Sequence, residues 1–208
     1  METLIEQFVT LWVVIDPIGT IPVYVAATAG FEPRERSLVA FHATLAAAGV
    51  LMFFLVLGQF LIDALGISLV AFQVSGGLVL FLFALTMIFG ESKMQAEIKD
   101  AKTALKEGTP AVFPIAVPSL AGPGAMLAVV LLTDNNRFSM PEQAVTAGLM
   151  LLVILCSLLL MLAAGPILKV IKVTGAAVVS RVMGIILAAV AVQNVIEAII
   201  ALLRTTKL

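Results

Sequence analysis

Two short segments of this 208-residue chain bring residues capable of polar chemistry into strongly apolar surroundings. The first segment, VIDPIGTIPVY at residues 14–24, contains Asp16, Pro17, Gly19 and Thr20. A proline inside a helix costs about 3 kcal/mol, because it removes a hydrogen bond and clashes with the preceding turn. A carboxylate such as that of Asp16 can cap free helix amides, or it can attract a cation, an ammonium group or a proton. The segment therefore predicts a broken helix that carries one acidic group.

The second segment, PSLAGPGAML at residues 118–127, has the same helix-breaking character without the charge. It contains Ser119, Gly122, Pro123 and Gly124. The hydroxyls of Ser119 and Thr20 can bind a ligand or the carbonyls that a break sets free. Packing and kink formation are the alternative roles, since Gly and Pro are common in membrane helices. Each segment is predicted to form a short helix, a break and a second short helix.

The composition indicates that lipid is the solvent of this chain. Hydrophobic residues make up 62% of the sequence and charged residues only 12%, against about a quarter in soluble domains. Six stretches are long enough to cross a hydrocarbon layer of about 30 Å as helices. They are Leu4–Ala29, Leu38–Ile62, Ile67–Phe89, Pro110–Thr133, Pro141–Gly165 and Gly175–Leu203. The predicted fold class is an all-α integral membrane protein with six transmembrane helices.

Features outside these stretches argue against several other classes. The start METLIEQFVTLW carries no Lys or Arg before its apolar run, so we expect a retained first helix rather than a removed signal. The net charge is −1 without a basic block, which argues against nucleic acid as a partner. Cys156 is the single cysteine, so neither an internal disulfide nor a redox pair is predicted. No metal or organic cofactor is expected.

The chain forms one membrane domain, residues 1–208, that divides into two similar halves. Residues 1–90 and 110–208 hold three spans each. A charged linker at 91–109, with a predicted surface helix at Lys93–Glu107, separates them. Because each half has an odd number of spans, the second half must enter the membrane from the opposite side.

Matched residues support this division. One offset aligns Gly58 with Gly165 and Gly77 with Gly184, and a nearly equal offset places Asp16-Pro17 beside Gly122-Pro123. The halves are therefore predicted to be inverted three-helix repeats, each with its first helix broken near mid-membrane. Interrupted spans at matched positions of two repeats point to the binding site of a secondary transporter.

Positive charges are unevenly distributed between the two predicted sides of the membrane. Most lie in the first, third and fifth connections: Arg34, Arg36, the lysines of residues 93–106, Lys169, Lys172 and Arg181. The other side has Arg137, Arg204 and Lys207. Since cytoplasmic loops are enriched in Lys and Arg, the 91–109 linker is expected in the cytoplasm and both termini outside.

The two predicted breaks would create a polar site inside lipid. In an inverted pair, the helices that begin after Pro17 and at Pro123 direct their N-terminal ends toward each other near the midplane. Each end offers unpaired amides and about half a positive charge, which suits a carboxylate. Asp16 either caps its own helix or attracts a positive group. A small zwitterion or anion fits this arrangement.

Four further polar residues lie in the predicted spans. Gln73 either faces the substrate or bonds a neighbouring helix. Asn194 and Glu197 are three residues apart on one helix face, where they either line the outward half of a pathway or reach the interface. His42, the only histidine, is either an interfacial polar residue or a proton relay.

The chain resembles the MarC/SnatA family of bacterial and archaeal membrane proteins. The resemblance is carried by DPIGTIPVY near the N-terminus, PSLAGPGAM in the second half and SGGLVLFLFALTMIFG in the third span. It implies a six-helix protein of the inner (plasma) membrane. It also implies transport of small neutral amino acids such as glycine and alanine, in several members as export.

A secondary transporter is the predicted function. Its substrate site would comprise Asp16, Pro17, Gly19, Thr20, Ser119, Gly122, Pro123 and Gly124, with Gln73 and Asn194 as further contacts. The chain has no GxxxxGK[ST] phosphate loop, so a proton or sodium gradient is the expected energy source, with Asp16 and Glu197 as coupling residues. A passive channel is the alternative, and a membrane-embedded enzyme has less support because no GxSxG or HExxH motif occurs. The oligomeric state is left open.

Overall fold

The computed structural model describes residues 4–89, 110–135 and 138–205, and its described part is built of helices. The first half contains α1 (Leu4–Ile15), α2 (Pro17–Ala27), α3 (Pro33–Ala64) and α4 (Leu69–Phe89). The second half contains the irregular helical segment η1 (Ala111–Leu120), α6 (Pro123–Leu132), α7 (Met140–Leu162) and α8 (Ala164–Thr205). The 91–109 linker, including the surface helix predicted at Lys93–Glu107, lies outside the described residues.

The long apolar segments largely match the predicted spans. Five are long and apolar enough to cross a membrane: Leu4–Ala27, Pro33–Ile62, Val70–Phe89, Met140–Leu162 and Ala177–Leu203. A sixth is obtained if η1 and α6, which are bent by 54° relative to each other, are taken together. The chain is therefore a multi-pass membrane protein by the length and composition of its helices.

One predicted span boundary was wrong by more than a turn. Helix α3 begins at Pro33 rather than Leu38, because its first turn is polar and the carboxylate of Glu35 accepts a hydrogen bond from the Glu32 amide at 2.9 Å. The apolar span of α8, Ala177–Leu203, agrees with the prediction, but the helix itself begins earlier, at Ala164. The backbone leaves the helical conformation only at Lys172, where φ is 56° and ψ is 171°. The predicted loop between the last two spans is thus mostly helical.

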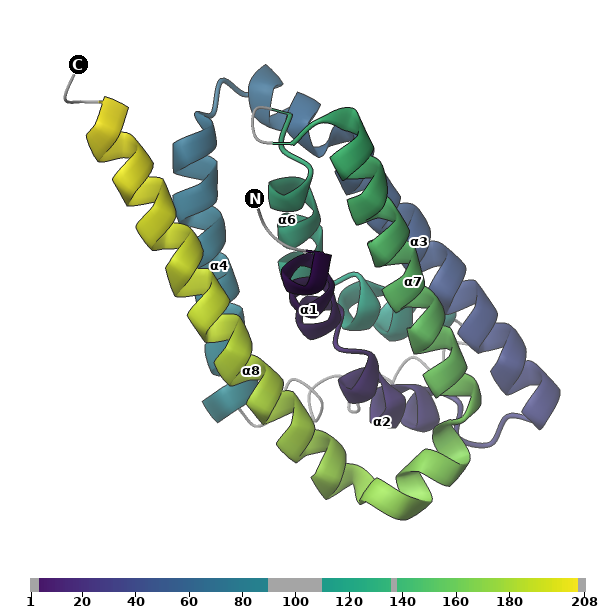
Figure 1. The fold of residues 1–208 in the computed structure, drawn as a ribbon. Helices are drawn as coiled ribbons and strands as arrows, with labels where there is room; N and C mark the ends of the chain where they lie inside the picture. Colours follow the sequence, from purple (N-terminus) through teal and green to yellow (C-terminus); the bar gives the residue numbers. More distant parts are fainter. Residues whose placement is uncertain (1–3, 90–109, 136–137, 206–208) are drawn as a thin grey trace.

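The helices form an outer frame around a short-helix core. Helices α4 and α8 run antiparallel along one side, and α3 and α7 run antiparallel along another (Figure 1). The four short segments α1, α2, η1 and α6 lie between these pairs. In the most apolar stretch of Leu4–Ala27, 67% of the residues are buried, against 17% in Ala177–Leu203. The broken segments are therefore the core of the protein.

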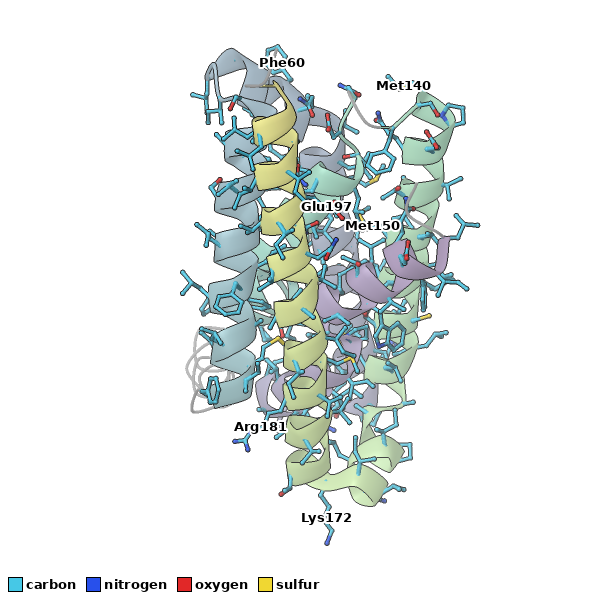
Figure 2. All side chains as sticks on the ribbon, turned by 60° about the vertical axis from the view of Figure 1, so that its left-hand side comes forward. Phe60, Met140, Met150, Lys172, Arg181 and Glu197 are labelled. Atoms are coloured by element: carbon cyan, nitrogen blue, oxygen red, sulfur yellow. The ribbon has the colours of Figure 1, made fainter. Side chains whose placement is uncertain are left out.

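The outer helices expose large apolar side chains along much of their length. Examples are Phe53 on α3, Leu82 on α4 and Leu159 on α7, which are 49–62% exposed. Charged Lys172 and Arg181 lie toward one end of the bundle, and Phe60 and Met140 lie at the other (Figure 2). An apolar girdle with charges at its end is the surface that a bilayer requires.

Candidate functional site

The break between α1 and α2 is a single residue, Asp16. Its backbone is in the left-handed region, with φ 51° and ψ 63°, which Asp tolerates better than most residues. Its amide still donates to the Trp12 carbonyl at 3.1 Å, so α1 continues up to this point. Pro17 then starts α2, because proline suits the first helical position and offers no amide that needs a partner.

The carboxylate of Asp16 caps α2. Its Oδ1 accepts a hydrogen bond from the Gly19 amide at 3.0 Å, while its backbone carbonyl accepts from the Thr20 hydroxyl at 3.1 Å. Asp16 is only 5% exposed. Of the two predicted roles, capping is therefore observed, and one carboxylate oxygen is used for it.

The second oxygen of this carboxylate is held by a residue from the other end of the chain. Ser180 of α8 donates its hydroxyl to Asp16 Oδ2 at 3.0 Å, across 164 positions of sequence. Ser180 is 7% exposed, so the contact is made in the protein interior. Both oxygens of the acidic group thus have hydroxyl or amide donors.

The two broken segments are joined by a hydroxyl pair. Ser119, at the end of η1, donates to the Thr20 hydroxyl of α2 at 3.4 Å. Each of these residues is 1% exposed. Helix α2 also packs against η1, and α1 packs against α6. The two segments therefore contact each other through the pairs α2–η1 and α1–α6, and not through close packing of α2 on α6, whose starts were predicted to converge.

The start of α6 differs from the start of α2 in its cap. Gly122 precedes the helix in an extended conformation and has no side chain that can cap, so the first amides of α6 lack the carboxylate that α2 has. The Gly122 carbonyl accepts from the Met126 amide at 3.0 Å, which begins the helical pattern. Before the break, Phe113 and Val117 are extended, as expected for residues that precede proline. Thus η1 is less regular than the short helix predicted here.

The glycines of both breaks face protein atoms. A Cβ at Gly19 would clash with the Asp16 carboxylate and would lie 2.7 Å from Ser180 Oγ. A Cβ at Gly122 would lie 2.8 Å from the Pro118 carbonyl oxygen, and one at Gly124 would lie 3.3 Å from Leu80 and Phe83 of α4. In this conformation these glycines permit tight turns and close helix packing.

The starts of α2 and α6 are staggered along the bundle. Gly124 is level with Leu80 and Phe83 of α4, and a Cβ at Gly184 would contact Ala84 and Met87. Because α4 and α8 are antiparallel, the level of Leu80 and Phe83 corresponds to a level on α8 that lies past Gly184, toward the C-terminal end of α8. Gly124 is at that level. Ser180, which contacts Asp16 at the start of α2, lies about two helical turns, or roughly 10 Å, nearer the Lys172 end than the level of Gly124 does.

Comparison with known proteins gives a family for this architecture. A family model described as "MarC family integral membrane protein" matches residues 1–203 of the chain. The chain belongs to the MarC family. A UPF0056 membrane protein of Methanocaldococcus jannaschii is 32% identical over 96% of this chain and 97% of its own length. Similar proteins of Archaeoglobus fulgidus (30% identity) and Escherichia coli (28%) each align over 92% of this chain and 89% of their own. No solved structure matches the chain.

Three predicted residues of this MarC chain lie away from the Asp16 site. Asn194 and Glu197 follow Ser180 on the same helix by about 21 and 25 Å. The Gln193 side-chain amide donates to the Glu197 carboxylate at 2.9 Å. Gln73 is buried on α4, one turn from Gly77, which packs against Ala191 and Val195. The two antiparallel helices thus place these three residues at one level, toward the end opposite to Lys172.

The sequence interpretation missed Ser180, although a usable signal was present. The offset that pairs Gly77 with Gly184 also pairs Gln73 with Ser180. A serine in a membrane helix does not by itself indicate a site, since its hydroxyl commonly bonds to a carbonyl of the preceding turn.

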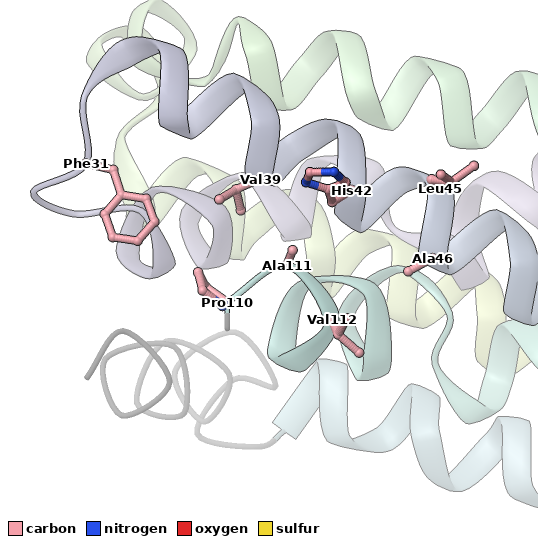
Figure 3. Close-up of a pocket in the computed structure, with 8 residues that line it drawn as sticks. All are labelled: Phe31, Val39, His42, Leu45, Ala46, Pro110, Ala111 and Val112. Atoms are coloured by element: carbon pink, nitrogen blue, oxygen red, sulfur yellow. The ribbon is translucent and has the colours of Figure 1, made fainter. Parts of the chain in front are cut away.

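A separate groove of about 550 Å³ lies between α3 and the start of η1 (Figure 3). Its lining is apolar except for His42: Phe31, Val39, Leu45, Ala46, Pro110, Ala111 and Val112. His42 projects from α3 beside Val112 of η1. The only histidine of this MarC chain therefore lines a surface groove and is not among the residues that contact Asp16.

Proposed function

We propose that this protein is a secondary transporter, acting as an exporter, of small neutral amino acids such as glycine and alanine. The observation that carries the proposal is the pair of helix starts inside the core. One start bears the buried carboxylate of Asp16, and the other begins at Gly122, which has no capping side chain. The Thr20–Ser119 hydroxyl pair connects α2 to η1, the segment that precedes Gly122. A membrane protein of the MarC family with this core has the elements needed to hold a zwitterion away from lipid.

The two poles of the substrate would use different helix starts. The ammonium group would pair with the carboxylate of Asp16, and the carboxylate would accept hydrogen bonds from the first amides of α6, where the helix dipole is positive. An amino acid is shorter than the stagger of roughly 10 Å between these ends. Binding would therefore require the core segments to approach each other, with the Thr20–Ser119 pair exchanging its contact for the substrate. That movement is the basis of alternating access in this proposal.

Reciprocal packing of α4 and α8 supports the inverted repeat. A Cβ at Gly77 would meet the Ala191 carbonyl oxygen and Val195, and a Cβ at Gly184 would meet the Ala84 carbonyl oxygen and Ile88. Adding 107 to the residue numbers 77, 84 and 88 gives 184, 191 and 195. The contact of Gly77 with Ala191 and Val195 thus has an equivalent in the contact of Gly184 with Ala84 and Ile88, with the residues of the two halves interchanged. A two-fold relationship between repeats requires such equivalent contacts.

Matched helix ends support the same relationship. The Glu35 carboxylate accepts from the Glu32 amide at 2.9 Å, and the Glu142 carboxylate accepts from the Ser139 amide at 2.8 Å. These pairs are again separated by 107 positions, at the starts of α3 and α7. Repeats of this kind are the usual framework for rocking motions around a central site.

Energy coupling and orientation are further parts of the proposal. Asp16 is the first candidate for coupling to a proton or sodium gradient, and Glu197 is the second. With the Lys172 end in the cytoplasm, Gln73, Asn194 and Glu197 would line the outward half of the pathway. Both termini would then be outside.

Counterflow of labelled alanine in proteoliposomes tests the proposal. A carrier should show saturable exchange, whereas a channel, the second reading of the same core, should show leak that does not saturate. Asp16→Asn should lower exchange at least tenfold, because asparagine caps a helix as well as aspartate does but cannot pair with ammonium. Asp134→Asn, which alters another buried carboxyl group, is the control and should retain exchange. Full activity of Asp16→Asn would remove Asp16 from the mechanism.

A further inference from the structure

The contact between Ser180 and Asp16 has a geometry that depends on three residues. Ser180 donates to Oδ2, and Gly19 donates to Oδ1, each at 3.0 Å. Because a Cβ at Gly19 would lie 2.7 Å from Ser180 Oγ, α8 can approach the carboxylate this closely only when residue 19 is glycine. The carboxylate oxygen that does not cap α2, Oδ2, is therefore accessible to a side chain of α8.

The Oδ2 atom is also the atom that the proposed function requires. Oδ1 holds the Gly19 amide, and breaking that bond would uncap α2. A positive group that pairs with Asp16 while the cap stays intact must therefore approach Oδ2. In the present conformation the Ser180 hydroxyl occupies that position.

We propose that Ser180 is a positioning residue that acts as a displaceable substitute for the amino group of the substrate. This inference rests on the proposed function. In the empty transporter the hydroxyl satisfies Oδ2 and keeps α8 against α2. A substrate ammonium, which binds a carboxylate more strongly than a neutral hydroxyl does, displaces it. Displacement releases α8 from α2, so α8 is the element that responds to occupancy.

The position of Ser180 on α8 allows this release to reach the rest of the frame. Gly184, one turn further along α8, packs closely against α4. A Cβ added at Gly184 would lie 2.8 Å from Met87 Cβ and 3.2 Å from the Ala84 carbonyl oxygen. Helices α4 and α8 are in close contact over much of their length. A change at Ser180 would therefore move α8 together with α4, against the core helix α2.

The direction in which Ser180→Ala changes substrate affinity distinguishes displacement from a purely structural role. Ser180→Ala removes the competing donor, so binding of labelled glycine or alanine to detergent-solubilised protein should become about tenfold tighter, the usual effect of a hydrogen bond to a charged group. The maximal rate of exchange should fall, because the hydroxyl no longer returns to Oδ2 when substrate leaves. Unchanged or weaker binding would overturn the proposal.

Two controls complete the experiment. Ser157→Ala removes another buried hydroxyl, which donates to the Val153 carbonyl of α7 at 2.9 Å, and should leave affinity unaltered. In an Asp16→Asn background, Ser180→Ala should have no further effect on affinity, and an independent effect there would also overturn the proposal.

Failure of the proposed function would be recognised separately. If the wild type binds no small neutral amino acid, the transport proposal fails. The Ser180 contact can still be measured in that case, as the coupling between Asp16→Asn and Ser180→Ala in thermal unfolding, and absence of coupling would show that the contact itself does not form.

Discussion

The Ser119 hydroxyl donates to the Thr20 hydroxyl across 99 positions of sequence, and each residue is 1% exposed. This bond connects the first half of the chain to the second at their breaks. Two other long-range bonds between side chains also join the halves, although not from break to break: Ser180 donates to Asp16, and Thr146 donates to Gln7. The halves are therefore interlocked through polar contacts in an otherwise apolar interior, where such contacts are specific because few alternative partners exist.

Removal of either hydroxyl should weaken the connection between the halves. We expect Thr20→Val, which keeps the shape of the side chain, and Ser119→Ala each to lower the free energy of unfolding by about 0.5–1.5 kcal/mol. Since the residues are partners, the double variant should cost less than the sum of the single ones. Thermal unfolding in detergent measures this, with a shift of about 2–4 °C per kcal/mol expected at this chain length. Strict additivity would show that the bond does not contribute to stability.

Gly19→Ala should be strongly destabilising. The new Cβ would clash with the Asp16 carboxylate and approach Ser180 Oγ, so both bonds of the carboxylate would be disturbed. We expect a loss of about 2 kcal/mol or more. The matched control is Gly148→Ala in α7, where the added Cβ has no heavy atom within 4 Å and alanine favours the helix. Equal melting temperatures of the two variants would contradict the geometry described for Gly19.

Gly77→Ala and Gly184→Ala should destabilise the protein by similar amounts. Their added Cβ atoms would lie 2.9 Å from the Ala191 carbonyl oxygen and 2.8 Å from Met87 Cβ, so either change overpacks the α4–α8 contact by about 1–3 kcal/mol. Gly49→Ala, with no heavy atom near the added Cβ, is the control for substitution in a membrane helix. A large effect at one glycine and none at the other would argue against a two-fold relationship between the halves.

Cysteine labelling tests the proposed orientation. After Cys156→Ser removes the native thiol, Leu65→Cys places a new thiol between α3 and α4, where the residue is 73% exposed. Lys172→Cys places one at the opposite end of the bundle. A membrane-impermeant maleimide should label residue 65 in intact cells, and residue 172 only after the membrane is opened. The reverse pattern would place the Lys172 end outside.

The apolar helical spans could be predicted from the sequence, as could helix boundaries at Asp16-Pro17 and Gly122-Pro123. Spans follow from apolar length, because a backbone in lipid must satisfy its amides within each helix. The breaks follow from local chemistry at Asp16-Pro17 and Gly122-Pro123, since proline has no amide to donate and aspartate accepts the free amides of the next turn. The repeated offset between the halves was also visible before any coordinates.

The atoms that surround Asp16 could not be predicted from the sequence, because they depend on helix packing. Ser180 is 164 positions away, and nothing in the local pattern of α8 distinguishes a hydroxyl that faces α2 from one that faces its own helix. The same holds for Gly19 and Gly124, whose missing side chains face Ser180 and α4 respectively. Local chemistry acts within a turn or two of helix, whereas helix rotation and register depend on how all the outer helices pack together, and that packing selected Ser180 as the partner of the buried carboxylate.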